Sequence, residues 1–180
     1  MAPFHLPEDE SRLDFSLIRD GGITLYWRSE YLREDIEWFR QQKYQVFSFD
    51  CARWISSEQM HTDFQEILAL PRWYGKNLDA LYDCLCSEDV TVPDEGGTVF
   101  VLSRFDVYAN SGGAARSSSG KSEAEVVLAI LAKSTRYFLL TGKRFLTLVQ
   151  SNNPHIRFEG IDCMAATWNQ REFPAKSRGT

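Results

Sequence analysis

Two aspartates placed four residues apart are the side chains whose spacing points most directly to chemistry. Asp79 and Asp83 follow Asn77, a residue type that commonly caps the N-terminus of a helix. Apolar residues then recur at intervals of three and four, which predicts a short helix with an apolar face of Leu78, Leu81, Tyr82 and Leu85. On that helix the two carboxylates share one face, where like charges repel each other. The pair therefore indicates a cationic partner.

Two roles besides partner binding have to be considered for this acidic pair, a structural one and a catalytic one. Asp79 would complement the helix dipole and Asp83 would simply be solvated, and on spacing alone this structural role is the favoured one. A catalytic pair is less compatible with the pattern, because the carboxylates of glycoside hydrolases flank a substrate across a cleft. Two aspartates one helical turn apart on a convex face do not obviously do so.

Other motifs for catalysis or metal binding are weak. The histidines, His5, His61 and His155, are scattered without metal-ligand spacing, so we expect solvated side chains. Gly120-Lys121-Ser122 resembles the end of a phosphate-binding loop, but Ala115 stands where that motif requires glycine. There is no nucleophile elbow and no dinucleotide-binding glycine motif. We therefore expect neither an enzyme nor a bound metal or cofactor.

Composition indicates a globular protein with a protein partner. The chain of 180 residues is 43% hydrophobic with a net charge of −5, which disfavours direct nucleic-acid binding and is compatible with a basic protein. No apolar run approaches the length of a membrane span, and the first ten residues do not resemble a signal peptide. A cytoplasmic location is expected. We accordingly interpret the cysteines as reduced, buried thiols: Cys51, Cys84, Cys86 and Cys163.

The elements that must position the aspartates follow an α/β pattern. Apolar runs predict strands at 23–27, 44–49, 98–102 and 145–149, hence a parallel sheet of about four strands. Helices are predicted to begin at a Ser29 cap and at a capping box of Ser56 and Gln59, and a long one runs from 123 to about 140. We expect an irregular arm at 1–22 with one turn near Leu13 to Ile18, a domain at 23–150 and an extension at 151–180 that packs on it. Within the domain, 23–43 would add one edge strand to a three-stranded core, and 110–122 would be a mobile loop.

Residues 70–85 also resemble a known family. Their pattern, Leu-Pro-x-aromatic-Tyr-Gly-x-Asn-Leu-Asp-Ala-Leu-aromatic-Asp-x-Leu, is similar to that of the barstar family, intracellular inhibitors of barnase-type ribonucleases. The match is gapless, and a weaker resemblance extends from Tyr44 to Gln150. The resemblance implies a barstar-like α/β fold, enlarged at both ends.

The same resemblance implies a function and a site. The protein would be a bacterial immunity or self-protection protein that inhibits a ribonuclease-type toxin, with no cofactor. Asp79 and Asp83 would mimic RNA phosphates, with Asp83 as the anchor, whereas Tyr74 would be structural. The partner-binding residues implied are Trp73, Gly75, Asn77, Asp79, Tyr82, Asp83 and Cys86. The alternatives are a non-inhibitory interaction module on the same scaffold and, more remotely, a small-molecule hydrolase.

One departure from the family pattern concerns the long helix. Barstar carries a further acid in the helix before its last strand, whereas the aligned position here is Lys133, with Arg136 following. A cation there would repel a strongly basic cleft, so the partner is expected to be a different toxin of similar kind. The sequence leaves open the identity of the toxin, the oligomeric state and the role of residues 1–43 and 151–180.

Overall fold

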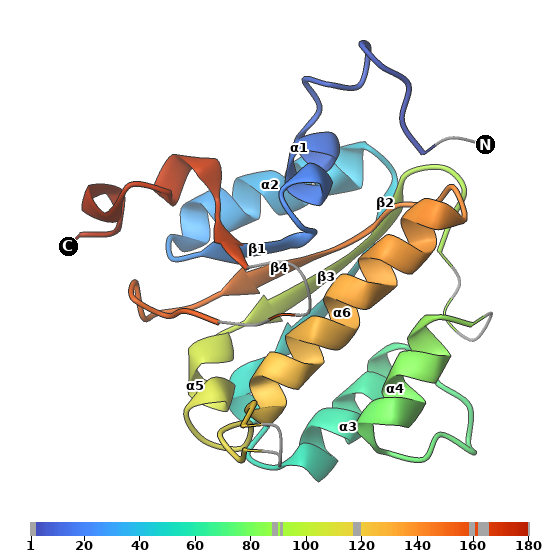
Figure 1. The fold of residues 1–180 in the computed structure, drawn as a ribbon, viewed down its shortest axis with the longest axis vertical. Coiled ribbons are helices and arrows are strands. Elements are labelled where there is room, and N and C mark those ends of the chain that lie inside the picture. Colours follow the sequence, from blue (N-terminus) through green and yellow to red (C-terminus); the bar gives the residue numbers. More distant parts are fainter. Residues whose placement is uncertain are drawn as a thin grey trace.

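The structure, a computed structural model, describes residues 3–87, 90, 92–116, 120–158, 161 and 166–179. Within these residues five strands form one parallel sheet in the order β2-β3-β4-β1-β5 (Figure 1). The strands are β1 (Ile23–Tyr26), β2 (Tyr44–Asp50), β3 (Gly97–Ser103), β4 (Phe145–Gln150) and β5 (Thr167–Trp168). β4 is buried along its whole length and β3 along nearly all of it, as central parallel strands covered on both faces should be. The predicted parallel α/β fold is confirmed.

Helices cover both faces of the sheet. One face carries α1 (Leu13–Arg19) and α2 (Ser29–Gln41), whereas the other carries α3 (Ser57–Ile67), α4 (Leu78–Leu85) and α6 (Glu123–Leu140) (Figure 1). The remaining helical segments are α5 (Phe105–Ala109) and the 3-10 turns η1 (Cys51–Arg53), η2 (Gln170–Glu172) and η3 (Ala175–Arg178). Each face has its own hydrophobic cluster, so α4 is held on the face opposite α2.

The two ends of the chain differ from expectation. β1, predicted at the edge of the sheet, lies between β4 and β5, because Thr24 and Leu25 pair with Thr167 and Trp168. In the first segment, the turn expected near Leu13 to Ile18 is longer than one turn, since residues 13–19 form the helix α1. Its apolar side packs with that of α2, a contact that its short length concealed.

The N-terminus of α2 is capped from a distant part of the chain. Ser29 begins the helix but does not cap it, and the N-cap residue Arg28 makes no side-chain capping bond. Instead the buried carboxylate of Glu172 accepts hydrogen bonds from the backbone N–H groups of Trp27 (3.1 Å) and Arg28 (2.7 Å). A carboxylate there satisfies orphan donors and complements the helix dipole.

The remaining predicted caps are partly as expected. Ser56 caps α3 by accepting a hydrogen bond from the backbone of Gln59, but the Gln59 side chain donates to Asp63 and so does not close a capping box. The complete box forms at α6, where Ser122 and Glu125 bond reciprocally. Gly142 follows α6 with a φ of 80°, the left-handed conformation in which glycine commonly ends a helix.

The tail is also fastened to α2 by a buried polar cluster. The carboxylate of Asp35 accepts hydrogen bonds from Tyr26 (2.7 Å), Asn169 (3.0 Å) and Arg171 (2.6 Å). Burial nevertheless raises the pKa of Asp35. These contacts place β5 and η2 beside β1 and α2 (Figure 1).

The loop before α4 is anchored to α3 by a buried histidine. His61 is 1% exposed, so the expectation of a solvated histidine was wrong, and its Nδ1 lies 2.5 Å from the hydroxyl of Tyr74. Burial lowers the pKa of His61, although the charge of Glu123 opposes the shift and that of Lys76 adds to it. His61 is therefore held neutral beneath the loop that carries the candidate residues.

This anchor predicts a loss of stability in acid. The unfolded chain binds a proton at this histidine more tightly than the folded chain does, so the free energy of unfolding should fall as the pH drops below about 6.5. Urea unfolding at about pH 7.5 and about pH 5.5 measures the effect. His61→Gln should reduce the difference between the two values, whereas His155→Gln, at an exposed position, should not. Equal losses in the wild type and in His61→Gln would contradict the assignment.

Candidate functional site

The start of α4 is set by Asn77. Its Oδ1 accepts a hydrogen bond from the backbone N–H of Ala80 at 2.8 Å, which makes it the predicted N-cap. Its Nδ2 also donates to the carbonyl of Gly75 at 3.3 Å. Asn77 thus joins the loop to the helix and fixes the residue at which the helix begins.

That starting point decides which side chains of α4 face outward. Leu81, Cys84 and Leu85 are buried in the main core cluster. Asp79 and Asp83 are exposed, together with Tyr82, which keeps 37% of its surface accessible. Within the described residues no Lys or Arg lies within ion-pair distance of either aspartate, so this part of the chain does not neutralise them. Their charges are available to a partner.

The loop preceding α4 presents one aromatic side chain and buries the next. Trp73 is 69% exposed, whereas Tyr74 is only 4% exposed and packs against α3, consistent with a structural role. The left-handed conformation that glycine tolerates is adopted in this loop by Lys76, whose φ is 46°, and not by Gly75. Gly75 has another reason to lack a side chain, because a Cβ there would lie 3.1 Å from the Asn77 amide. Lys76 also donates to Thr62 at 3.1 Å, a second tie between loop and α3.

Cys86 lies at the end of α4 and faces the long helix. Its Sγ is 3.6 Å from Ser134 Oγ of α6, and burial raises the pKa of the thiol. It therefore borders the exposed face formed by Asp79, Tyr82 and Asp83. Cys51 and Cys84 are buried thiols, as expected, and Cys163 lies outside the described residues.

α6 brings a cation to the same surface. Lys133 is exposed, and its Nζ lies 5.9 Å from the centroid of the Tyr82 ring, within the range of a cation–π contact. In the sequence, Lys133 is identified only by its alignment with the acidic residue that the barstar pattern has in this helix. Its proximity to Tyr82 follows from the packing of α4 against α6, which no local spacing in the sequence reveals.

The Gly120-Lys121-Ser122 segment leads into α6, and a side chain of the helix itself bonds the donors at this end. Ser122 caps the helix, and the carboxylate of Glu125 accepts hydrogen bonds from the Ser122 N–H (2.7 Å) and hydroxyl (2.9 Å). An anion of the chain itself thus occupies the place that a bound anion would take.

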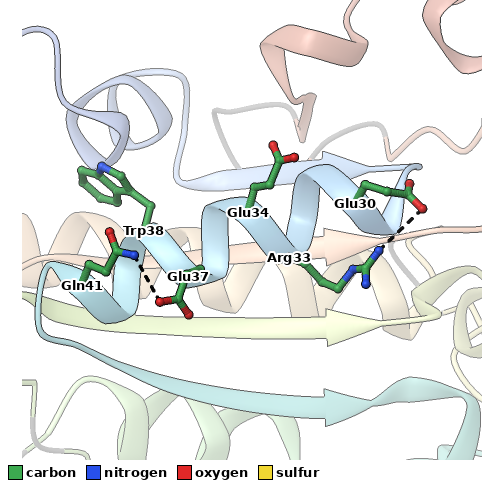
Figure 2. A pocket seen from close by; sticks show the side chains of 6 residues that line it. All are labelled: Glu30, Arg33, Glu34, Glu37, Trp38 and Gln41. Carbon is green, nitrogen blue, oxygen red and sulfur yellow. Dashed lines mark hydrogen bonds and ion pairs between the residues drawn. The ribbon is translucent and has the colours of Figure 1, made fainter.

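A surface hollow lies on the outer face of α2, on the opposite side of the sheet from α4. It is lined by Glu30, Arg33, Glu34, Glu37, Trp38 and Gln41. Figure 2 shows Arg33 directed toward Glu30 and Gln41 toward Glu37, at 3.7 Å and 3.2 Å respectively. Glu34 pairs with Arg171 at 2.6 Å. Because most of these charges are already paired, the hollow is a weaker candidate than the face of α4.

The described part of the chain lacks two further features. No group of three or more His, Cys, Asp or Glu side chains there could hold a metal ion. None of its helices is both long and apolar enough to cross a membrane.

Comparison with known proteins identifies the scaffold that carries this face. A family model described as Barstar (barnase inhibitor) matches residues 44–150, more than half of the chain. That range contains α3, the anchored loop, α4 and α6, and three strands of the sheet. A search of curated protein sequences found no significant match. On the family match, together with the parallel sheet and its helices, the chain belongs to the barstar family.

Proposed function

We propose that this protein inhibits a ribonuclease-type toxin by covering its active site with residues 72–77 and the outer face of α4. The observation that carries the proposal is the pair of exposed aspartates, Asp79 and Asp83, which no described Lys or Arg neutralises. The family match supports it, since the family is described as a barnase inhibitor.

The mechanism is occlusion combined with electrostatic capture. A ribonuclease must bind the phosphates of RNA with cationic side chains. Two carboxylates one helical turn apart can take the place of phosphates in such a cleft, and Asp83, farther along the helix, would be the anchor. No bond is made or broken, so no cofactor takes part. The net charge of −5 would also speed encounter with a basic partner.

The neighbouring residues complete the proposed interface. Trp73 and Tyr82 offer aromatic surface of the kind enriched at the centres of interfaces. Gly75 and Asn77 let the loop backbone approach the enzyme closely, and Cys86 lies at the border. These seven residues are the proposed partner-binding set: Trp73, Gly75, Asn77, Asp79, Tyr82, Asp83 and Cys86.

The loop is already ordered before any partner arrives. His61 holds Tyr74 from below, Thr62 accepts a hydrogen bond from Lys76, and Asn77 closes the junction with α4. Little conformational entropy then remains to be lost on binding, which favours affinity. A cytoplasmic self-protection role fits this arrangement, because a preformed plug can capture a toxin as it is made.

Removing the anchor tests the proposal. The protein is titrated against a panel of small basic ribonucleases, barnase included, while cleavage of a fluorogenic RNA is followed. Asp83→Ala should weaken inhibition of the responsive enzyme by at least about tenfold, mainly through faster dissociation. The reason is that a cationic side chain of the ribonuclease, buried in the complex, loses the carboxylate that it pairs with. Thermal stability should be unchanged or slightly raised, since the repulsion from Asp79 is relieved.

The matched control is Glu37→Ala, which removes the same charge from the opposite face of the protein. It should leave inhibition within about threefold of the wild type. If Asp83→Ala unfolds the protein without a separable loss of inhibition, the aspartate is structural. Binding of a ribonuclease without inhibition would favour the interaction-module alternative.

The adjacent aromatics Trp73 and Tyr74 give a paired test of the loop. Trp73→Ala should weaken binding by about tenfold while changing the melting temperature by less than about 2 °C, because the side chain is mostly exposed. Tyr74→Ala should instead lower the free energy of unfolding by about 3 kcal/mol, because it empties a buried site and leaves His61 unpaired. Differential scanning calorimetry and surface plasmon resonance separate the two effects. Unchanged binding by Trp73→Ala would remove this residue from the interface.

A further inference from the structure

The face proposed to bind the toxin carries charge of both signs. Asp79 and Asp83 supply the negative charge from α4, and Lys133 supplies a positive charge from α6. The ring of Tyr82 lies between the two helices, with the Lys133 ammonium 5.9 Å from its centroid. A partner that covers Tyr82 therefore also approaches Lys133.

The position of Lys133 is rigidly set by its helix. Ala132 and Ser134 on either side are fully buried, and the Ser134 hydroxyl bonds to the Ile130 carbonyl at 3.0 Å. The backbone at Lys133 therefore cannot turn away without disturbing the core. The face of Tyr82 further favours keeping the ammonium beside α4.

The charge of Lys133 is also not neutralised by the described part of the chain. No Asp or Glu among those residues lies within ion-pair distance of its ammonium. Lys143, which follows α6 in the sequence, differs in this respect, because its ammonium lies 3.7 Å from the carboxylate of Asp94. Lys133 thus resembles the two aspartates in offering an uncompensated charge at the surface.

Covering an uncompensated ammonium has energetic consequences. Taking it out of water opposite another cation combines desolvation with repulsion between like charges, which disfavours association. An acidic side chain opposite the ammonium removes the repulsion and adds a charge-assisted hydrogen bond. A surface of this kind therefore discriminates between partners by the sign of the charge opposite Lys133.

We infer that the ribonuclease captured by this protein carries a carboxylate side chain at the rim of its cationic cleft, positioned to meet Lys133. This inference rests on the proposed function and adds the chemistry of the partner. The partner presents cations opposite α4 and at least one Asp or Glu opposite α6. A ribonuclease whose rim is uniformly cationic is rejected.

Variants of Lys133 test the inference on the same ribonuclease panel. For the enzyme that the wild type inhibits, Lys133→Glu should weaken binding by at least about tenfold, because attraction becomes repulsion between two acids. The affinity of Lys133→Gln should lie between those of the wild type and Lys133→Glu. The affinity of Lys133→Arg should stay within about threefold of the wild type. Melting temperatures confirm that each variant is folded.

The matched control is Arg33→Glu, which makes the same change of charge on α2, on the opposite face of the sheet, where Arg33 is 73% exposed. It should change binding by less than about threefold, which separates a local contact from a general effect of net charge. Equal or tighter binding by Lys133→Glu, with the Asp83→Ala loss intact, overturns the inference alone. If the wild type inhibits no ribonuclease of the panel, the proposed function is overturned and the inference with it.

Discussion

The register of α4 is the constraint on which the candidate site depends. Asn77 determines where the helix begins, and Leu81, Cys84 and Leu85 determine which side of it enters the core. Once both are set, the geometry of the helix directs the side chains of Asp79, Tyr82 and Asp83 toward solvent. A helix shifted by one residue would rotate by about 100° and carry an acidic side chain toward the core. The site is thus a by-product of one cap and one apolar stripe.

The second level of organisation is the pairing of α4 with α6. α6 packs on the sheet through its buried side, and α4 lies against α6 rather than alone on the surface. This arrangement makes the exposed face a two-helix surface, in which α4 contributes acids and α6 contributes Lys133. The net charge of this surface is then less informative than the positions of its positive and negative side chains. Specificity arises both from attraction between opposite charges and from repulsion between like charges across the interface.

Features encoded by short-range patterns could be predicted from the sequence. The strands at β1 to β4, the Asn77 cap and the outward direction of Asp79 and Asp83 each follow from residues within one or two turns. Features that depend on distant partners could not. Glu172 caps α2 across 144 residues, and His61 is buried because Tyr74 meets it from another segment. β5 has no signature in the sequence, because two residues are too few to produce a periodic pattern.

The backbone conformation of the loop before α4 also could not be predicted from residue type. Gly75 is the residue type that tolerates a positive φ, yet the turn places that conformation at Lys76. Composition says which residues can adopt a conformation at low energy, whereas the path of the loop decides which one must. Here the hydrogen bonds of Asn77 to Gly75 and Ala80 impose the path.

The distant cap of α2 has a consequence for how the chain is made. Synthesis proceeds from the N-terminus, so the barstar-like stretch up to Gln150 leaves the ribosome before Asn169 and Glu172 emerge from it. Until they emerge, the outer edge of β1 is uncovered, and the amides of Trp27 and Arg28 just before α2 lack their acceptor. The nascent protein therefore passes through a stage with an open strand edge, which its own last segment then closes.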